Sequence, residues 1–517
     1  MKRIDRRTAL RQSGSYSLLP LVGGATVGTG RALAAPKYAH PLFTLGVASG
    51  DPLPHGVVIW TRLAPDPLNG GGMPRQRVRI RWEVAEDENM TKIVRSGKWT
   101  ARPENGHAIR REVGGLSPGR WYWYRFHAMG FESPIGRTRT APAATDAPDS
   151  LKLAVACCQN YQYGYYTAYK HMAEEDLDLV LHVGDYIYEG GVKDDLTREH
   201  NSAEVTTLEA YRNRYALYKL DPYLQAAHAA FPWAAVPDDH EVDNDYANDR
   251  EAKGRVSPEE FLRRRAAAYK AYYEHMPFRP ASRPIGPDMP LFRSLRFGDL
   301  ATVNLLDTRQ FRSPQACGRK WEPRCEAAFD PARTMLGEDQ ENWLDGRFGD
   351  SITRWTVLSQ QVPIMQRRRP VDGVDLYHTD KWDGYVAARN RLFESIRRND
   401  VKGLVTLSGD VHNNWAGQLK ADFDNPESET IGNEFVATSI SSNGDGKDIK
   451  KSQIRIVEAN PHIAFFNGQR GYLRCLVDRN EWRTDYRVVP YVTRKGAPIS
   501  TRASFIADRE SGGLREA

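Results

Sequence analysis

Long apolar runs are missing from most of this chain. Beyond residue 35, no stretch approaches the ~20 consecutive apolar residues that a membrane-spanning helix needs. Basic residues are also dispersed, with a net charge of +6 over 517 residues; one short basic run after the leader is the triplet Arg367–Arg369. We interpret this triplet as a solvated loop. The sequence contains no Lys/Arg-dense helix, which is the pattern that would indicate nucleic-acid binding. We therefore expect a soluble mature protein with neither a transmembrane anchor nor a nucleic-acid-binding surface.

Cysteine is scarce, with five residues in the chain. Cys317 and Cys325 bracket a short polar loop, which leaves a disulfide and two free thiols as equally weighted alternatives. Cys475 follows an aromatic, strand-like run and is predicted to be a buried small apolar residue. The His-Glu-x-x-His helix of zinc peptidases is absent from the sequence, which argues against that class.

The first 35 residues have the features of an export signal. Arg6 and Arg7 open the stretch Arg-Arg-Thr-Ala-Leu-Arg, a weakly apolar run follows over Ser17–Gly30, and Ala32–Ala34 precedes a cleavage site. Paired arginines with low hydrophobicity favour the twin-arginine route. We expect the translocation machinery of that route to be a partner during export, and the mature protein to be periplasmic or secreted.

Two domains are expected from the length of the chain. Residues 36–140 predict an all-β, immunoglobulin-like or fibronectin-like domain, and Leu116–Gly119 before Tyr122 resembles a tyrosine corner. Residues 141–150 are small and Pro-rich and predict a linker. The strands predicted in the N-terminal domain are Val57–Arg62, Val78–Val84, Ile93–Thr100, His107–Val113 and Trp121–Ala128.

Residues 151–517 alternate strand and helix patterns, which predicts an α/β catalytic domain with a C-terminal segment. Its predicted helices include Tyr163–Glu175, a helix capped by Ser257 that runs to about Tyr273, and Tyr385–Arg398. Its predicted strands are Leu151–Ala156, Leu179–Val183, Trp233–Val236, Ala301–Leu306, Trp355–Leu358 and Gly403–Leu407.

Potential metal ligands follow four of these strands. They are Cys158, Asp185 with Tyr188, Asp239 with His240, and Asp410 with His412. Because strands of a layered α/β protein end at one edge of the sheet, we expect these side chains to meet. Carboxylate, phenol, thiol and imidazole groups at one place indicate a metal-assisted hydrolase.

Each candidate has a separate chemical reason. Asp185 follows Gly184, which permits a sharp turn, and its carboxylate can bridge two cations. The phenol of Tyr188 suits ferric iron. The thiol of Cys158 suits a transition metal once deprotonated, whereas the adjacent Cys157 is expected to point away.

Two further residues are predicted to act in catalysis. His240, beside Asp239, is a candidate proton-transfer group. Arg309 follows another strand end, where it is either an anion clamp or the partner of Asp307 in a structural ion pair.

The motifs together resemble the metallophosphoesterase superfamily, and more closely its PhoD-type alkaline phosphatases and phosphodiesterases. The segments that carry the resemblance are Val47–Pro54, Val58–Arg62, Cys158–Tyr161, Gly184–Glu189, Asp238–Val242 and Ser408–His412. The resemblance implies a four-layer β-sandwich flanked by helices. It also implies Fe³⁺ at Cys158, Tyr188, Asp185 and His412, with Ca²⁺ at Asp185, Asp239 and Asp410; hard oxygen ligands independently suit calcium.

The sequence thus predicts a secreted metal-dependent alkaline phosphatase that acts on phosphate esters. Two alternatives stay open. One is a dedicated phosphodiesterase acting on teichoic acid or phospholipid head groups, which would use the same chemistry in a different pocket. The other is a non-catalytic surface-binding protein with a decayed second domain, against which the complete set of ligands argues.

Overall fold

Two large sheets form the centre of the structure. A computed structural model describes residues 41–517, so the predicted signal at residues 1–35 lies outside the described part of the chain. The larger sheet has ten strands, in the spatial order β25 (Leu514–Glu516), β24 (Ser500–Asp508), β23 (Glu481–Val489), β22 (Arg470–Asp478), β9 (Ser150–Ala156), β10 (Leu179–His182), β11 (Pro232–Ala235), β1 (Val47–Leu53), β2 (Gly56–Arg62) and β5 (Ala108–Gly114). The second has seven, in the order β12 (Arg293–Phe297), β13 (Ala301–Leu305), β15 (Trp355–Ser359), β18 (Leu404–Ser408), β20 (Thr430–Val436), β19 (Asn414–Lys420) and β21 (Ile463–Asn467).

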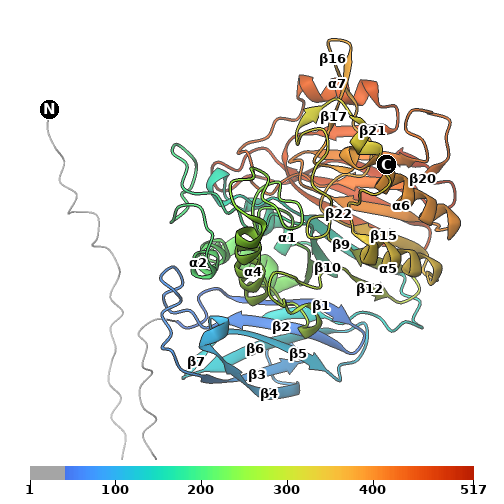
Figure 1. The fold of residues 1–517 in the computed structure, drawn as a ribbon. Coiled ribbons are helices and arrows are strands. Elements are labelled where there is room, and N and C mark those ends of the chain that lie inside the picture. Colours follow the sequence, from blue (N-terminus) through green and yellow to red (C-terminus); the bar gives the residue numbers. More distant parts are fainter. Residues whose placement is uncertain (1–40) are drawn as a thin grey trace, which may run out of the picture. The chain divides into compact units, whose positions relative to one another are not determined.

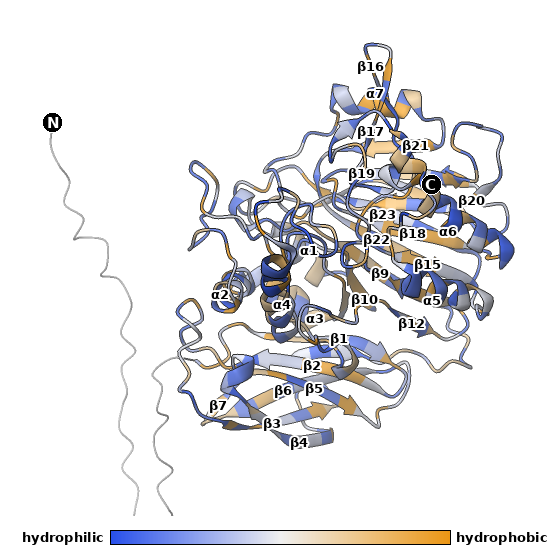
Figure 2. Ribbon diagram, in the orientation of Figure 1, coloured by the Kyte–Doolittle hydropathy of each residue, from blue (hydrophilic) through white to orange (hydrophobic). Residues whose placement is uncertain are grey.

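The strands that precede the candidate ligands are apolar on both faces. In β9, Leu151, Leu153 and Val155 pack in the core between the two sheets, while Ala154 and Ala156 pack in a second core with the helices. This alternation follows from the two-residue period of a strand. β9, β10 and β11 run parallel to one another, and a parallel strand buried on both faces has a continuous apolar sequence. Figure 2 shows hydrophobic segments in the strands of both large sheets and in the N-terminal strands.

Helices cover the outer face of each large sheet. One group packs on the ten-stranded sheet and consists of α1 (Thr167–Ala173), α2 (Leu208–Lys219), α3 (Pro222–Ala230) and α4 (Pro258–His275). The other packs with the seven-stranded sheet and consists of α5 (Glu338–Gly349), α6 (Val386–Arg398) and α7 (Lys451–Ala459). Figure 1 shows α2 and α4 on one side of the strands and α5 and α6 on the other. The chain is therefore an α/β protein, as predicted.

The N-terminal strands form a smaller sandwich. Its first sheet contains β4 (Ile93–Ala101), β3 (Val78–Ala85), β6 (Trp121–Ala128) and β7 (Phe131–Glu132), with β8 (Gly136–Arg139) paired to β6. A shared core joins it to β1, β2 and β5. The Ser117 amide donates a hydrogen bond of 2.9 Å to the Tyr122 hydroxyl, which is the contact expected of a tyrosine corner.

The ten-stranded sheet contains strands from both sides of the predicted linker at residues 141–150. β1 pairs in parallel with β11, so that Ser49 lies opposite Pro232 and Gly50 opposite Trp233. Trp60 also reaches across, and its indole nitrogen donates a hydrogen bond of 2.8 Å to the Glu274 carbonyl oxygen. The division of the chain at residues 141–150 stays a prediction, and backbone pairing connects the segments on either side of it.

Local patterns located the elements well. Every strand named from the sequence is found, with boundaries that differ by no more than one residue. The capping box at Ser257 is confirmed, since its hydroxyl accepts a 3.3 Å hydrogen bond from the Glu260 amide. The helix predicted over Tyr163–Glu175 is shorter and is preceded by a 3₁₀ turn over Tyr161–Tyr163. Four helices, α2, α3, α5 and α7, were not predicted.

The cysteine predictions are also resolved. Cys317 and Cys325 form a disulfide with a Cα–Cα distance of 5.5 Å, and Cys475 is fully buried. The Cys157 sulfur lies 3.4 Å from the Thr438 carbonyl oxygen, within the core, and so points away from Asp185. None of the helices within residues 41–517 combines the length and apolar character needed to cross a bilayer.

A small third sheet stands beside the seven-stranded one. It consists of β14 (Trp321–Glu322), β17 (Val374–His378) and β16 (Arg369–Val371), all antiparallel. Trp321 is paired with His378, and the disulfide at Cys317 and Cys325 encloses the segment that contains β14. This sheet forms one wall of the candidate site described below.

Lys219 gives the fold a testable pH dependence. Its side chain is buried beneath the N-terminal strands, with the ammonium 4.3 Å from the Trp60 ring centroid. Burial lowers the pKa of Lys219 to about 7. The unfolded chain therefore binds more protons than the folded chain between pH 7 and the ordinary lysine pKa of about 10.4, so stability rises with pH in this window.

We expect Lys219→Met to be more stable than wild type at pH 7, with the difference shrinking as the pH approaches 10. Denaturant unfolding at several pH values measures this. Lys170→Met, which removes an exposed ammonium paired with Glu174, is the control and should show no such trend. A constant difference between wild type and Lys219→Met across the window would contradict the prediction.

Candidate active site

The four predicted loops meet at one place, but they come from two sheets. Cys158, Asp185 and Asp239 follow β9, β10 and β11 of the ten-stranded sheet. Asp410 and His412 follow β18 of the seven-stranded sheet. The prediction that these residues converge is confirmed. The sequence suggested a single sheet edge, whereas the site lies where the carboxyl ends of strands from two packed sheets come together.

The first group of potential ligands mixes sulfur, oxygen and nitrogen. Ligand atoms of Cys158, Asp185 and His412 all lie within 4.8 Å of one another. The Tyr188 hydroxyl donates a hydrogen bond of 2.8 Å to Asp185 Oδ2 and lies 3.2 Å from His412 Nε2. Tyr188 therefore belongs to the same cluster. The Ser442 hydroxyl, 2.7 Å from the Tyr188 oxygen, holds the phenol in place.

The remaining groups consist mainly of carboxylates. Three further sets meet the same 4.8 Å limit, namely Asp185 with Asp239 and His240, Asp238 with Asp239 and Asp410, and Asp239 with Asp245 and Asp380. Asp185 belongs both to the mixed group and to the set with Asp239 and His240, as a bridging carboxylate would. Asp239 is shared among all three carboxylate sets. The groups form one continuous cluster.

The backbone at these loops is unusual. Cys158, Asp185, Asp410 and His412 all have positive φ, between 55° and 66°. Non-glycine residues rarely adopt this region, and they do so mainly where the surrounding structure holds them for a function. Glu241 supplies part of that support, because its buried carboxylate accepts hydrogen bonds from the amides of Asp185, at 3.2 Å, and Asp238, at 2.7 Å.

Arg309 is fully buried among the carboxylates. Its guanidinium pairs with Asp238 through Nε, with Asp380 at 3.1 Å, with Asp410 at 3.2 Å and with Asp239 at 3.4 Å. The predicted alternative, a side-chain ion pair with Asp307, is wrong, since Asp307 instead accepts a hydrogen bond from the Arg309 backbone amide. Lys381 adds a second cation, 2.5 Å from Asp410 and 2.8 Å from Asp380.

Burial and charge divide the titrating groups in two. Burial raises the pKa of Asp185, of the Cys158 thiol and of the Tyr188 phenol well above their ordinary values. Burial opposes the ionisation of Asp239 and Asp410 as well, but Arg309 and Lys381 outweigh it and lower the pKa of both. The positive charges of Arg309 and Lys381 thus favour the ionised forms of Asp239 and Asp410 much more than those of Cys158, Asp185 and Tyr188 in the mixed group.

The two histidines differ in the same way. Burial, assisted by Arg470, lowers the pKa of His412 to about 3, so this ring is neutral and can ligate a metal. Burial also opposes protonation of His240, but Glu189, Asp185 and Asp239 raise its pKa well above the ordinary value. His240 Nδ1 lies 2.6 Å from Glu189 Oε2, which fixes the orientation of the ring.

A cavity of about 390 Å³ opens onto this cluster. Asp185, Asp239, His240, Asp410 and His412 are among its lining residues. Its lining also includes the basic and aromatic residues Arg319, Lys320, Trp321, Arg367 and His378. A cavity that combines an acidic, ligand-rich cluster with basic side chains suits an anion held between cations and positive side chains.

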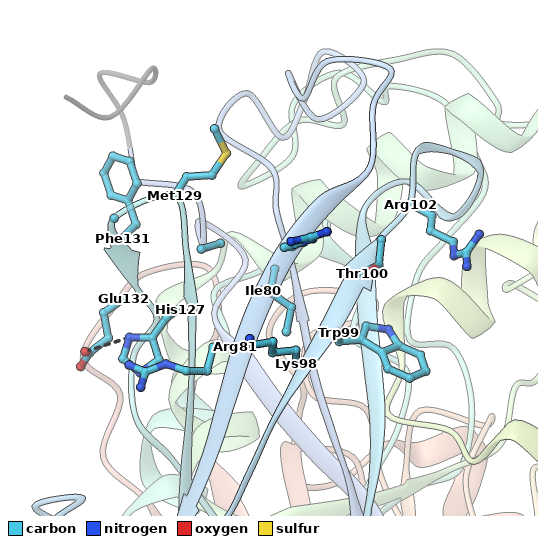
Figure 3. Close-up of a pocket in the computed structure, with 13 residues that line it drawn as sticks. Ile80, Arg81, Lys98, Trp99, Thr100, Arg102, His127, Met129, Phe131 and Glu132 are labelled. Carbon is cyan, nitrogen blue, oxygen red and sulfur yellow. Dashed lines mark ion pairs between the residues drawn. The ribbon is translucent and has the colours of Figure 1, made fainter. Parts of the chain in front are cut away.

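A second cavity, of about 680 Å³, lies on the N-terminal sheet. Figure 3 shows Arg81, Lys98 and Trp99 among its lining residues, and an ion pair between His127 and Glu132. Among the described residues, no set of potential metal ligands that includes a lining residue of this cavity comes within the 4.8 Å limit. The smaller cavity is therefore the candidate active site.

Several site residues were not predicted from the sequence. Glu189, Asp245, Asp380 and Lys381 lie in or beside the cluster, and only the first stood in a recognised motif. The interpretation of Arg367–Arg369 as a solvated loop is wrong for Arg367, whose side chain is 3% exposed. Arg367 follows β15 and lines the cavity, and its burial there could not be predicted because no local sequence pattern encodes that position.

Comparison with known proteins agrees with this geometry. The family described as PhoD-like phosphatase matches residues 153–486, and its N-terminal domain matches residues 29–142. The chain is 49% identical to alkaline phosphatase D of Bacillus subtilis (strain 168), over 99% of this chain and 89% of that protein. A solved structure titled "Structure of PhoD" superposes with a TM-score of 0.91 at 50% identity and covers 93% of each chain.

These matches define the class of the protein as a phosphoric ester hydrolase. The chain belongs to the PhoD-like phosphatase family. The family resemblance drawn from the sequence motifs is thereby confirmed.

Gly184 offers a direct test of the loop geometry. Its φ is +114°, and an added Cβ would lie 2.3 Å from the Asp238 Cβ and 2.8 Å from the Asp238 amide. Gly184→Ala must therefore push apart the loops that carry Asp185 and Asp239. We expect it to lose at least about 2 kcal/mol of unfolding free energy and most of the activity.

Gly190→Ala is the matched control, because an added Cβ there has no neighbour within 4 Å. Chemical denaturation and turnover of an aryl phosphate are the measurements. Wild-type stability and turnover in Gly184→Ala would show that the two loops are not in contact.

Proposed function

We propose that the chain is a secreted, metal-dependent alkaline phosphatase that hydrolyses phosphate monoesters and diesters. The observation that carries this proposal is the continuous cluster formed by the ligand groups around Asp185 and Asp239, in a cavity whose lining also includes basic side chains. The printed name of the B. subtilis relative, alkaline phosphatase D, supports the same activity. We further propose that the two large sheets and their covering helices are a metallophosphoesterase-type sandwich, preceded by an immunoglobulin-like N-terminal domain.

The chemistry of the donor atoms fits two kinds of cation. We assign Fe³⁺ to Cys158, Asp185, Tyr188 and His412, since thiolate, phenolate and imidazole suit a transition metal. We assign Ca²⁺ to the carboxylates of Asp185, Asp239 and Asp410.

Unpaired carboxylate atoms support this fit. Within residues 41–517, the buried atoms Asp185 Oδ1 and Asp238 Oδ2 have no hydrogen-bond partner. A buried carboxylate oxygen without a partner is costly, and a bound cation would remove that cost. The mixed group needs such a charge most, because Arg309 pairs with carboxylates of the other groups.

Bound cations would hold the phosphate oxygens and lower the pKa of an attacking water. The protein's own contribution centres on His240. Glu189 fixes its Nδ1, and the Tyr188 ring packs against the imidazole with a centroid distance of 4.0 Å. The other ring nitrogen is then available to protonate the departing oxygen. The backbone N–H of Asn244 donates a 3.0 Å hydrogen bond to Glu189 Oε1 and completes this support.

Arg309 we propose as a positioning residue that acts through its carboxylate partners. Its three nitrogens are all engaged by Asp238, Asp239, Asp380 and Asp410. It therefore fixes the carboxylates relative to one another and reduces the repulsion between their charges. In this proposal Arg309 stabilises charge on the substrate indirectly, by positioning these carboxylates.

Export by the twin-arginine route and a periplasmic or secreted location remain proposals based on residues 1–35. This route carries folded proteins, which suits an enzyme that acquires its metals before export.

The activity is tested with purified full-length protein on an aryl phosphate and a bis-aryl phosphate. We expect turnover of both substrates, loss of both after treatment with a strong chelator, and recovery when iron and calcium are restored. Dialysis without chelator is the control. Metal-independent turnover would overturn the proposed site, and failure to hydrolyse either ester would overturn the proposed function.

Tyr188 tests the identity of the metal. Phenolate or thiolate bound to ferric iron should give the protein visible absorption, and Tyr188→Phe should shift that band or reduce its intensity. Tyr186→Phe is the matched control, because the Tyr186 hydroxyl contacts His228 at 2.7 Å, away from the cluster. Elemental analysis accompanies the spectra. A colourless, fully active wild type would remove Tyr188 and Cys158 from the metal site.

A further inference from the structure

Arg367 is a buried cation in the lining of the candidate active site. Its side chain is 3% exposed, and within the described part of the chain its Nε and one terminal nitrogen have no hydrogen-bond acceptor. No ion pair between Arg367 and a carboxylate is formed among residues 41–517. An unpaired guanidinium in such a place is costly, and burial accordingly lowers its pKa.

The neighbours of Arg367 position it without neutralising it. Its Cζ lies 5.9 Å from the Trp321 ring centroid and 5.8 Å from that of Trp415. Asp383 accepts a 3.0 Å hydrogen bond from the Arg367 backbone amide, but its carboxylate is paired with the side chains of Arg324, at 2.7 Å, and Arg389, at 2.9 Å. The nearby acid is thus committed to other cations.

The contrast with Arg309 shows what Arg367 is free to do. Both side chains are buried beside the same cavity, yet within residues 41–517 Arg309 pairs with four carboxylates and Arg367 with none. Arg367 lines the cavity onto which the carboxylate cluster opens. The cavity therefore presents a buried, preformed guanidinium that can bind an anion in addition to the ligand groups.

Two more basic residues near the surface line the same cavity. Arg319 and Lys320 line the cavity, and neither forms an ion pair within residues 41–517. The segment that bears them is held at both ends, since the Cys317–Cys325 disulfide closes it and the Lys320 carbonyl oxygen accepts a 2.9 Å hydrogen bond from the Thr379 amide. Their backbone is therefore fixed beside the cavity.

We propose that Arg367, with Arg319 and Lys320 at the rim, forms a subsite for a second phosphate group of the substrate. The inference rests on the proposed function, in which the scissile phosphate lies at the carboxylate and thiol cluster. The preferred substrates are then phosphate esters that carry at least one further phosphate. A buried guanidinium that lies near two tryptophan rings and forms no ion pair with a carboxylate of the described residues binds such a group more strongly than an exposed arginine would.

Two substrates with the same reacting group test the proposal. Thymidine 5′-(p-nitrophenyl phosphate) carries only the scissile phosphate, and its 3′-phosphorylated analogue carries one more. We expect the wild type to prefer the bisphosphate, with the difference mainly in KM. Arg367→Gln should reduce the ratio of kcat/KM for the bisphosphate to kcat/KM for the monophosphate by roughly 10- to 100-fold. Arg367→Lys should restore part of that ratio.

Two further variants guard the interpretation. Arg369→Gln removes the same charge from the same triplet at a side chain outside the cavity lining, and should leave the ratio at its wild-type value. The double variant Arg319→Gln/Lys320→Gln changes only the rim and should lower the ratio severalfold, which provides a test even if Arg367→Gln does not fold. Thermal melting of each variant accompanies the kinetics.

The opposite outcomes are distinct. Equal losses on both substrates in Arg367→Gln would overturn the subsite, because Arg367 would then serve the scissile phosphate or the fold. A wild type that does not distinguish the two substrates would also overturn it, while leaving the proposed function intact. A wild type that hydrolyses neither substrate would overturn the proposed function and the subsite with it.

Discussion

The structure depends above all on how it carries a large negative charge in a buried place. Asp185, Asp238, Asp239 and Asp380 are all nearly inaccessible, and carboxylates in a low-dielectric setting repel one another and resist ionisation. Arg309 offsets part of that cost at the centre of the cluster. Within residues 41–517, no lysine or arginine forms an ion pair with Asp185 of the mixed group, and the buried Arg470 donates its 2.6 Å hydrogen bond to the His412 carbonyl oxygen, which is the physical reason for expecting a metal there.

Arginine serves two opposite purposes around the same cavity. Arg309 forms ion pairs with acidic residues, and these ion pairs hold together loops from both large sheets. Arg367 is surrounded by aromatic rings and by an acid already paired with other arginines, so its charge remains available. Burial alone distinguishes neither role, and only the identity of the contacting groups separates a structural cation from a binding one.

Much of the fold could be predicted because it is encoded locally. The strand of Leu151–Ala156 is apolar on both faces, and the helix after Ser257 begins with a capping box, so each is visible in a window of a few residues. The pairing of β1 with β11 could not be predicted, because it joins segments about 180 residues apart and depends on the packing of both large sheets. The unpredicted helix α2 owes its stability to tertiary contacts more than to a clear amphipathic pattern.

The sequence by itself determined which side chains are available to the candidate site, since Cys158, Asp185, Tyr188, Asp239, Asp410 and His412 stand in short motifs directly after apolar strands. Because parallel strands have their carboxyl ends at the same edge of a sheet, motifs that directly follow such strands predict a shared site. Only the tertiary structure decided that two sheets contribute to it, that Asp380 and Lys381 join it, and that Arg367 is left unpaired. Those outcomes depend on which distant groups come into contact and how much water they exclude, and no local pattern of residues specifies that.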